Sequence, residues 1–177
     1  MEAIYPRELL ACLKSKYLLL DTNVFIDYAF NEPAFTNFLN LLKSSDVTLA
    51  ITDVVRFEFF KGAKNALKYA EKELFLKKIV DVDIPAVAKT MSLGHELIKE
   101  YGIEGSVLSS TDVILGSLLK QYPAHIYLMT RDTTDFICGV FNLCYMVNIP
   151  HDKGVFSYGI YKYPSKADAP TTEVVPF

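Results

Sequence analysis

Short apolar runs alternate along this chain with segments of helical periodicity, and that alternation restricts the fold more than any other feature. The apolar runs predict strands over residues 17–20, 47–51, 79–83, 126–130 and 143–148. Strands separated by helices need crossover connections, which make a sheet parallel and cover both of its faces. We therefore expect an α/β fold of three layers, α/β/α, with a central, mainly parallel sheet of about five strands.

Between the strands, the sequence predicts helices over residues 33–44, 53–79, 85–102 and 110–122. Pro33 is well placed to start the first of them. Gly62 is expected to break or kink the second helix, and Gly102 to end the third. Ser110 or Thr111 is expected to cap the fourth helix.

The length of 177 residues suits one domain with a sizeable core. We expect that domain over residues 1–163, followed by a flexible C-terminal tail over 164–177 that has several prolines and few apolar residues. No apolar stretch is long enough to span a bilayer, and the first residues do not resemble an export signal. Three cysteines without CxxC spacing favour a reduced, cytoplasmic protein without a zinc site.

The net charge of −3 argues against a protein that grips long duplex DNA mainly through its phosphates. Such proteins usually carry a basic excess. A local basic stripe can still coexist with an acidic total, so binding to other nucleic acids is not excluded by this charge.

Acidic residues fall where the predicted strands end. Asp21 directly follows the first strand, and Asp132 and Asp135 follow the fourth. Ligands of open parallel sheets bind beyond the carboxyl ends of the strands. Glu58, in the helix after the second strand, and Asp112, in the first turn of the last helix, are expected to reach the same edge. The sequence thus predicts a cluster of carboxylates.

Each acid also has a structural explanation. Asp21 could cap a helix together with Thr22 and Asn23, Asp112 could complement a helix dipole, and the acids after the fourth strand could belong to a turn. Glu58 is harder to explain in this way, because its three phenylalanine neighbours predict a well-buried helix. A buried carboxylate needs a partner.

Carboxylates gather in one pocket only if some are protonated or if cations neutralise them. Two of them about 4 Å apart repel by roughly 4 kcal/mol at an effective dielectric constant near 20. Oxygen ligands without cysteine or histidine suit Mg²⁺ or Mn²⁺. Such ions can activate a water molecule for hydrolysis of a phosphodiester. The acids therefore predict a metal-dependent hydrolase.

Four motifs in order resemble the motif series of PIN-domain nucleases, and most of all the VapC-type toxins of VapBC toxin–antitoxin pairs. They are DTN at 21–23, Glu58 in RFEFFKG, STDVILGSLL at 110–119 and TRDTTDF at 130–136. The match in order and spacing covers about residues 16–150. This chain departs from the toxin pattern in its negative net charge and in a C-terminal segment beyond about residue 150.

The resemblance implies an enzyme that cleaves RNA with Mg²⁺ or Mn²⁺. It assigns metal-site positions to four acids, with Asp135 as a competitor of the last of them: Asp21, Glu58, Asp112 and Asp132. It implies that three neighbours orient these carboxylates: Thr22, Asn23 and Thr130. It also implies a homodimer and, for a toxin, a small inhibitory antitoxin protein.

Three functions remain open from the sequence. The first is a metal-dependent endoribonuclease, either a toxin or a housekeeping RNA-processing enzyme. The second is a catalytically silent PIN-like module that binds a protein partner. The third is a phosphatase or phosphotransferase with an aspartyl nucleophile. The third is disfavoured, because no second acid lies two residues after Asp21 and no lysine is obviously placed to steady a phosphoryl intermediate.

Overall fold

The computed structural model describes residues 2–104 and 108–165. Its helices are α1 (Glu8–Leu13), α2 (Thr22–Tyr28), α3 (Glu32–Ser44), α4 (Asp53–Lys61), α5 (Ala66–Ile79), α6 (Ala88–Glu104) and α7 (Ser110–Gln121). Its strands are β1 (Lys16–Leu20), β2 (Val47–Ile51), β3 (Val82–Asp83), β4 (Ile126–Thr130), β5 (Asn142–His151) and β6 (Gly154–Lys162). Most of the tail predicted over 164–177 falls outside the described residues.

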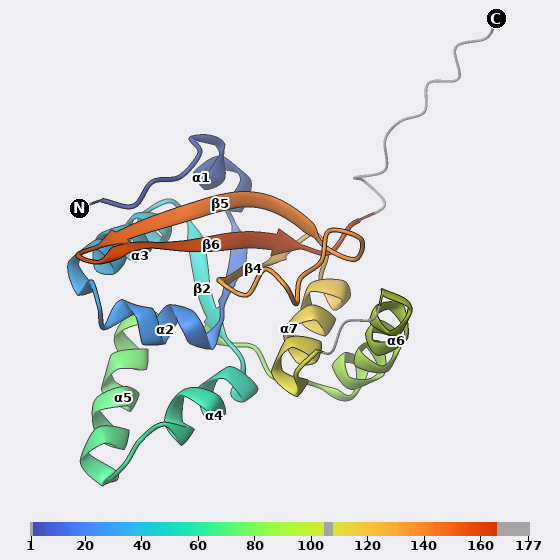
Figure 1. The fold of residues 1–177 in the computed structure, drawn as a ribbon, viewed down its shortest axis with the longest axis horizontal. Helices are drawn as coiled ribbons and strands as arrows, with labels where there is room; N and C mark the ends of the chain where they lie inside the picture. Colours follow the sequence, from blue (N-terminus) through green and yellow to red (C-terminus); the bar gives the residue numbers. More distant parts are fainter. Residues whose placement is uncertain (1, 105–107, 166–177) are drawn as a thin grey trace, which may run out of the picture.

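The six strands form one sheet in the order β3-β2-β1-β4-β6-β5 (Figure 1). The first four strands in this order are parallel to one another. Strand β6 is antiparallel to both β4 and β5, with which it forms a long hairpin. Strands β1 and β4, which the two groups of acids follow, are direct neighbours, and the predicted fold class is confirmed.

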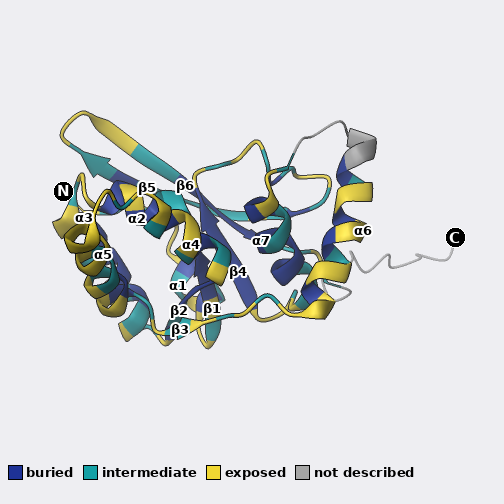
Figure 2. Cartoon of the chain, turned by 90° about the horizontal axis from the view of Figure 1, so that it is seen from below, coloured by how far each residue is buried: buried dark blue, intermediate teal, exposed yellow. Residues whose placement is uncertain are grey.

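The centre of the sheet is buried on both faces. Leu18, Leu19 and Leu20 of β1 have no exposed surface, and successive side chains of a strand point to opposite faces. Figure 2 shows the same arrangement, with buried residues on the strands and exposed residues on the outer sides of α3, α5 and α6. Burying one such leucine stabilises the fold by about 1.5–3 kcal/mol. The three-leucine run is thus a core strand.

The strand prediction was wrong in two places. The run over 79–83 supplies only the two residues of β3, because Ile79 still belongs to α5. Strand β6 was not predicted, because it lies between two other strands and buries Tyr158, Gly159, Ile160 and Tyr161 in succession. A strand without alternating burial has no period of two in its sequence.

The helix prediction was correct at Gly62, which follows the last residue of α4 and separates it from α5. It was wrong at Gly102, since α6 continues to Glu104. It was also wrong by a residue at α7, where Ser109 is the cap and its hydroxyl accepts a hydrogen bond from the backbone N–H of Asp112 (3.2 Å). Within the described ranges, no helix is both long enough and apolar enough to cross a membrane.

Candidate active site

Asp21 lies at the point where β1 ends and α2 begins, and only 6% of its surface is exposed. Its carboxylate accepts hydrogen bonds from the backbone N–H of Thr22 (2.5 Å), from Asn23 Nδ2 (2.6 Å) and from Thr130 Oγ1 (2.6 Å). The capping interpretation of this acid is therefore correct. It does not exclude a second role, because the cap also fixes the carboxylate at the carboxyl edge of the sheet.

Thr130, the last residue of β4, connects the two central strands at this edge. Besides donating to Asp21, its hydroxyl accepts hydrogen bonds from Asn23 Nδ2 (3.1 Å) and from the backbone N–H of Asp132 (3.0 Å). The side-chain oxygen of Asn23 in turn accepts from the backbone N–H of Arg131 (3.2 Å). The start of α2 and the loop after β4 thus form one network around Asp21.

Asp112 approaches the same edge from the first turn of α7 and is also buried. The Ser109 hydroxyl donates a hydrogen bond to its carboxylate. Burial raises the pKa of Asp112, and the charges on Asp132 and Glu58 raise it further, while the hydrogen bond from Ser109 lowers it. Neighbouring carboxylates therefore act on this acid.

Glu58 does not have the buried position that the sequence suggested. It is exposed, and 70% of the adjacent Phe57 is exposed as well. Only Val55 and Phe59 of α4 are buried, since residues four apart share one face of a helix. Three phenylalanines in four consecutive positions cannot all face the core.

Two hydroxyl groups nevertheless hold Glu58 beside the other acids. Its carboxylate accepts hydrogen bonds from Thr22 Oγ1 (2.8 Å) in α2 and from Thr111 Oγ1 (2.5 Å) in α7. Glu58 therefore bridges the helices that carry Asp21 and Asp112. Sequence reasoning missed the contribution of Thr111, although its position directly before Asp112 was a usable signal.

The loop after β4 contributes Asp132 and Asp135. One oxygen of Asp132 accepts a hydrogen bond from Thr134 Oγ1 (2.8 Å). The backbone carbonyl of Asp135 accepts one from the Tyr101 hydroxyl of α6. Burial raises the pKa of Asp135 to about 6, with further contributions from the charges on Asp132 and Asp112. Both acids of this loop thus reach the group around Asp112.

The five acids form one electrostatic cluster without a compensating base. Burial raises the pKa of Asp21 to about 6 against the hydrogen bonds that it accepts, and the charges on Asp112 and Glu58 add to the rise. Among the described residues, no lysine or arginine forms an ion pair with any of the five. Their mutual repulsion is therefore balanced by no cationic side chain.

The chemistry of these donors fits a hard divalent cation. All of the groups are oxygen ligands, and a cation would neutralise the repulsion that raises the pKa of Asp21 and Asp112. As they stand, no three Asp, Glu, His or Cys side chains of residues 2–104 and 108–165 lie close enough together to hold a metal ion. Hydroxyl groups now bind several of these carboxylates, so the side chains would have to turn inward to surround a cation.

Comparisons with known proteins identify the family. The family model of the PIN domain matches residues 18–136, more than half of the chain. The chain belongs to the PIN domain family. None of the proteins with curated descriptions matches this sequence. The matched residues include all five acids, whereas β5 and β6 lie beyond the end of the match.

Two solved structures share the fold of this PIN domain. The VapBC2 complex from Rickettsia felis, bound to a DNA fragment from its promoter, gives a TM-score of 0.50 at 24% identity, covering 63% of this chain and 96% of that chain. A toxin–antitoxin complex from Klebsiella pneumoniae gives a TM-score of 0.52 at 23% identity, covering 68% of this chain and 91% of that chain. The resemblance to the PIN domain family is confirmed by the family model, and these two structures share its fold.

A further acid of this PIN domain, Asp27, was not singled out from the sequence. Only 2% of its surface is exposed, and its carboxylate accepts a hydrogen bond from the Tyr158 hydroxyl of β6 (2.8 Å). It also pairs with Arg131, whose Nη1 lies 3.2 Å from the Asp27 Oδ2 atom. An acid in the otherwise apolar stretch NVFIDY was the available signal, since a buried carboxylate needs partners.

Tyr158→Phe should lower the free energy of unfolding by about 1–3 kcal/mol, because it deprives a buried carboxylate of one of its donors. Urea unfolding of the two proteins measures this difference. The matched control is Tyr17→Phe, which alters a tyrosine that is 41% exposed and is expected to change little. Equal destabilisation by both substitutions would contradict a special role for the bond to Asp27.

Without metal, the stability of this PIN domain should fall as the pH rises from about 4 to about 7. The pKa of Asp21 is about 6 in the folded protein and 3.8 ordinarily, so the folded state binds more protons than the unfolded state between these values. The loss of stability that comes from ionising the buried Asp21 is absent below the ordinary pKa and complete above pH 6. It amounts to roughly 3 kcal/mol at 1.36 kcal/mol per pKa unit.

The measurement is urea unfolding in EDTA at several pH values, for the parent protein and for Asp21→Asn. The difference between the two proteins isolates Asp21 from all other titrating groups. We expect the variant to gain stability relative to the parent as the pH rises. A difference that stays constant over this range would contradict the raised pKa of Asp21.

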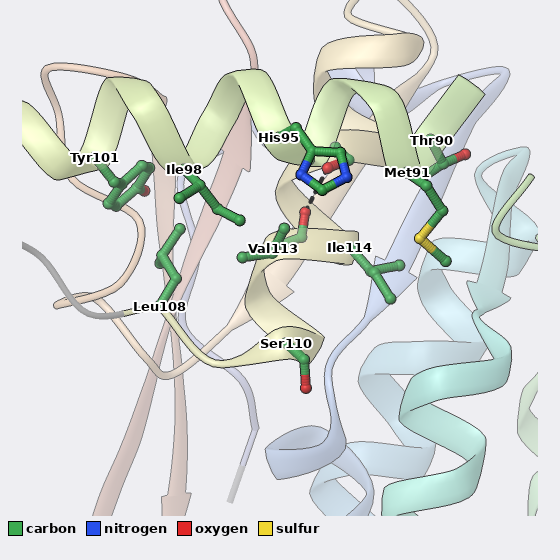
Figure 3. A pocket seen from close by; sticks show the side chains of 11 residues that line it. Thr90, Met91, His95, Ile98, Tyr101, Leu108, Ser110, Val113 and Ile114 are labelled. Atoms are coloured by element: carbon green, nitrogen blue, oxygen red, sulfur yellow. Dashed lines mark hydrogen bonds between the residues drawn. The ribbon is translucent and has the colours of Figure 1, made fainter. Parts of the chain in front are cut away.

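An apolar cavity lies between α6 and α7 (Figure 3). It encloses about 530 Å³ and is lined by side chains such as Met91, Ile98, Val113 and Ile114. Among the residues that the structure describes, no acid lines it, although Ser110 brings it next to the first turn of α7. This cavity is therefore separate from the carboxylate cluster and is not the candidate active site.

Proposed function

We propose that this chain is a Mg²⁺- or Mn²⁺-dependent ribonuclease, an endonuclease that hydrolyses phosphodiester bonds of RNA. The observation that carries the proposal is the convergence of five uncompensated acids at the carboxyl edge of β1 and β4 in a chain of the PIN domain family. PIN nucleases generally use divalent metal ions. Such an ion supplies an activated water and stabilises charge on the phosphate when it is bound.

Three acids would hold the metal from three different elements: Asp21 before α2, Glu58 in α4 and Asp112 in α7. The fourth ligand would come from the loop after β4, as Asp132 or Asp135. Thr22, Asn23 and Thr130 already hydrogen-bond to these carboxylates or join their network, which fits a role in orienting them. The pKa values of Asp21 and Asp135 are raised, as is expected of clustered carboxylates that have no bound cation.

The silent-module alternative is less well supported. A catalytically inactive module has no need to keep like charges together, and a basic side chain would be expected to neutralise them. The arginine that is nearest in sequence, Arg131, pairs with Asp27 and not with the cluster. We therefore retain catalysis as the function that this geometry favours.

We further propose that the enzyme works in the cytoplasm as the toxin of a pair, inhibited by a small antitoxin protein. The similarity in fold to the two toxin–antitoxin complexes supports this role. None of the three cysteines, all of which lie in the described part of the chain, forms a disulfide, which suits a reducing compartment. We also propose a homodimer. Met91 and Ile98, which line the cavity between α6 and α7, are each about half exposed, and such apolar exposure suits an interface.

The test is cleavage of single-stranded and structured RNA by the purified protein. We expect cleavage with Mg²⁺ or Mn²⁺, loss of cleavage in EDTA and recovery when the metal is restored. Isothermal titration of metal into the parent and into Asp21→Asn gives an independent measurement. Absence of both metal binding and RNA cleavage at millimolar metal would overturn the proposal.

A further inference from the structure

A second cavity of about 560 Å³ lies between α2 and the turn of the β5–β6 hairpin. We call it the hairpin groove, and the residues used below are Phe30, Arg131, His151, Lys153 and Phe156. Two of these come from the family-matched part of the chain. The other three come from the hairpin, which lies beyond that match. The groove is therefore built jointly by the family-matched part of the chain and by the hairpin that follows it.

The groove offers aromatic surface to a ligand. Phe30 is 67% exposed, although its ring also lies edge-on to that of Phe156, with centroids 6.0 Å apart. His151 stacks on Phe156 at 4.2 Å, and the guanidinium of Arg131 lies over the same ring at 5.3 Å. Planar groups already stack on one another here. An unpaired nucleic-acid base is the kind of ligand that adds to such a stack.

The groove also offers positive charge. Arg131 and Lys153 both line it, together with two acids: Asp152, which is exposed, and Asp27, which is buried and paired with Arg131. The ion pair of Arg131 with Asp27 uses its Nη1 atom, while a guanidinium carries five N–H donors. The remaining donors suit a phosphate oxygen, which Arg often binds with two parallel hydrogen bonds. Base stacking and phosphate binding thus occur side by side.

The groove adjoins the acidic cluster. Arg131 lies in sequence between Thr130 and Asp132, and its backbone N–H is bonded to Asn23 of the Asp21 network. From Thr22 to Asp27, α2 rises only about 7 Å at 1.5 Å per residue. This is comparable to the spacing of neighbouring phosphates on one strand. A strand that is cut at the cluster and continues along α2 therefore reaches the groove within one or two nucleotides.

We propose that the hairpin groove binds an unpaired nucleotide of the RNA substrate beside the cut site, with its base against Phe30 and its phosphate at Arg131 and Lys153. The proposal rests on the ribonuclease function proposed above and makes it more specific. It gives this chain a preference for single-stranded RNA, because a base held in a duplex cannot stack on Phe30.

The test measures binding of a short, fluorescently labelled single-stranded RNA by anisotropy in EDTA, in an Asp21→Asn background that does not cut it. Phe30→Ala is expected to weaken binding about tenfold, as loss of one stacked base does, and Phe30→Tyr is expected to restore it. Lys153→Gln is expected to weaken binding about threefold. It should also reduce the slope of log affinity against log salt by about 0.7.

Two control variants match these changes. Leu67→Ala removes an apolar side chain of α5 that is also 67% exposed, and Lys14→Gln removes an exposed charge just before β1, at the opposite edge of the sheet. Both controls should bind like the background protein. The turn that carries Lys153 is exposed, so Lys153→Gln tests the groove even if Phe30→Ala folds poorly.

Binding by Phe30→Ala and Lys153→Gln that equals the background would overturn the groove proposal. So would equal losses with single-stranded and duplex RNA, because a stacking site discriminates between them. These failures differ from failure of the proposed function, in which the parent protein neither cuts RNA with Mg²⁺ or Mn²⁺ nor binds it.

Discussion

Asp21→Asn is expected to lower RNA cleavage by at least about three orders of magnitude while the protein stays folded. The substitution removes a charged metal ligand at the centre of the network, so water activation and charge stabilisation are lost together. The volume of the side chain barely changes. Cleavage with Mn²⁺, measured beside thermal unfolding, separates loss of chemistry from loss of fold.

Near pH 7, the stability of this variant should remain close to that of the parent, for two opposing reasons. Neutralising Asp21 relieves the burial and repulsion that raise its pKa. A carboxamide, however, has one acceptor oxygen for the three donors that now bind Asp21, although the Thr130 hydroxyl can turn to accept instead. Activity and stability therefore respond to different properties of one side chain.

Asp46→Asn is the control for this experiment. Asp46 is exposed, lies just before β2 at the opposite edge of the sheet, and has a backbone φ of 65°, which asparagine adopts readily. It should cleave RNA like the parent. Full cleavage by well-folded Asp21→Asn would mean that the activity comes from another site or from a contaminant, and the proposed active site would be wrong.

Asp135→Asn is expected to lower cleavage at least about a hundredfold, and at least as much as Asp132→Asn. The pKa of Asp135 is raised to about 6 by burial and by the charges on Asp132 and Asp112, which places it within the cluster. One oxygen of Asp132 is instead bound by Thr134. These differences favour Asp135 as the fourth metal ligand.

Thr134→Ala tests whether Asp132 contributes to the site, since it removes the hydroxyl that holds Asp132 without changing any charge. It should leave most of the activity if Asp135 is the ligand. Metal affinity by titration should then drop for Asp135→Asn more than for Asp132→Asn. A severe loss confined to Asp132→Asn would reverse the assignment.

The central strands could be predicted from the sequence because their environment is uniform. Residues 47–51 and 126–130 are apolar except for Thr48 and Thr130, and all of them but Thr48 are buried, so a mainly apolar run and a buried strand coincide. The edge at which Asp21 and Asp132 meet then follows from parallel pairing alone. This part of the candidate site needed no knowledge of side-chain packing.

The remainder could not be predicted, because it depends on contacts between distant residues. Glu58 is held by Thr22 and Thr111, which are 36 and 53 residues away in sequence. The partner of Asp27 is Tyr158, 131 residues away, on a strand whose burial pattern gives no signal. Local periodicity reports which side of an element is apolar. It does not report which polar groups meet across the fold.

The position of β6 inside the sheet affects how this protein can fold during synthesis. The ribosome makes β6 last among the six strands, yet this strand lies between β4 and β5. Until residues 154–162 have emerged, the edge of β4 is unpaired, and such edges readily pair with other chains. Until then, the carboxylate of Asp27 also lacks the hydrogen bond from the Tyr158 hydroxyl. A growing chain therefore carries an unfinished sheet until residues 154–162 have emerged and the hairpin closes it.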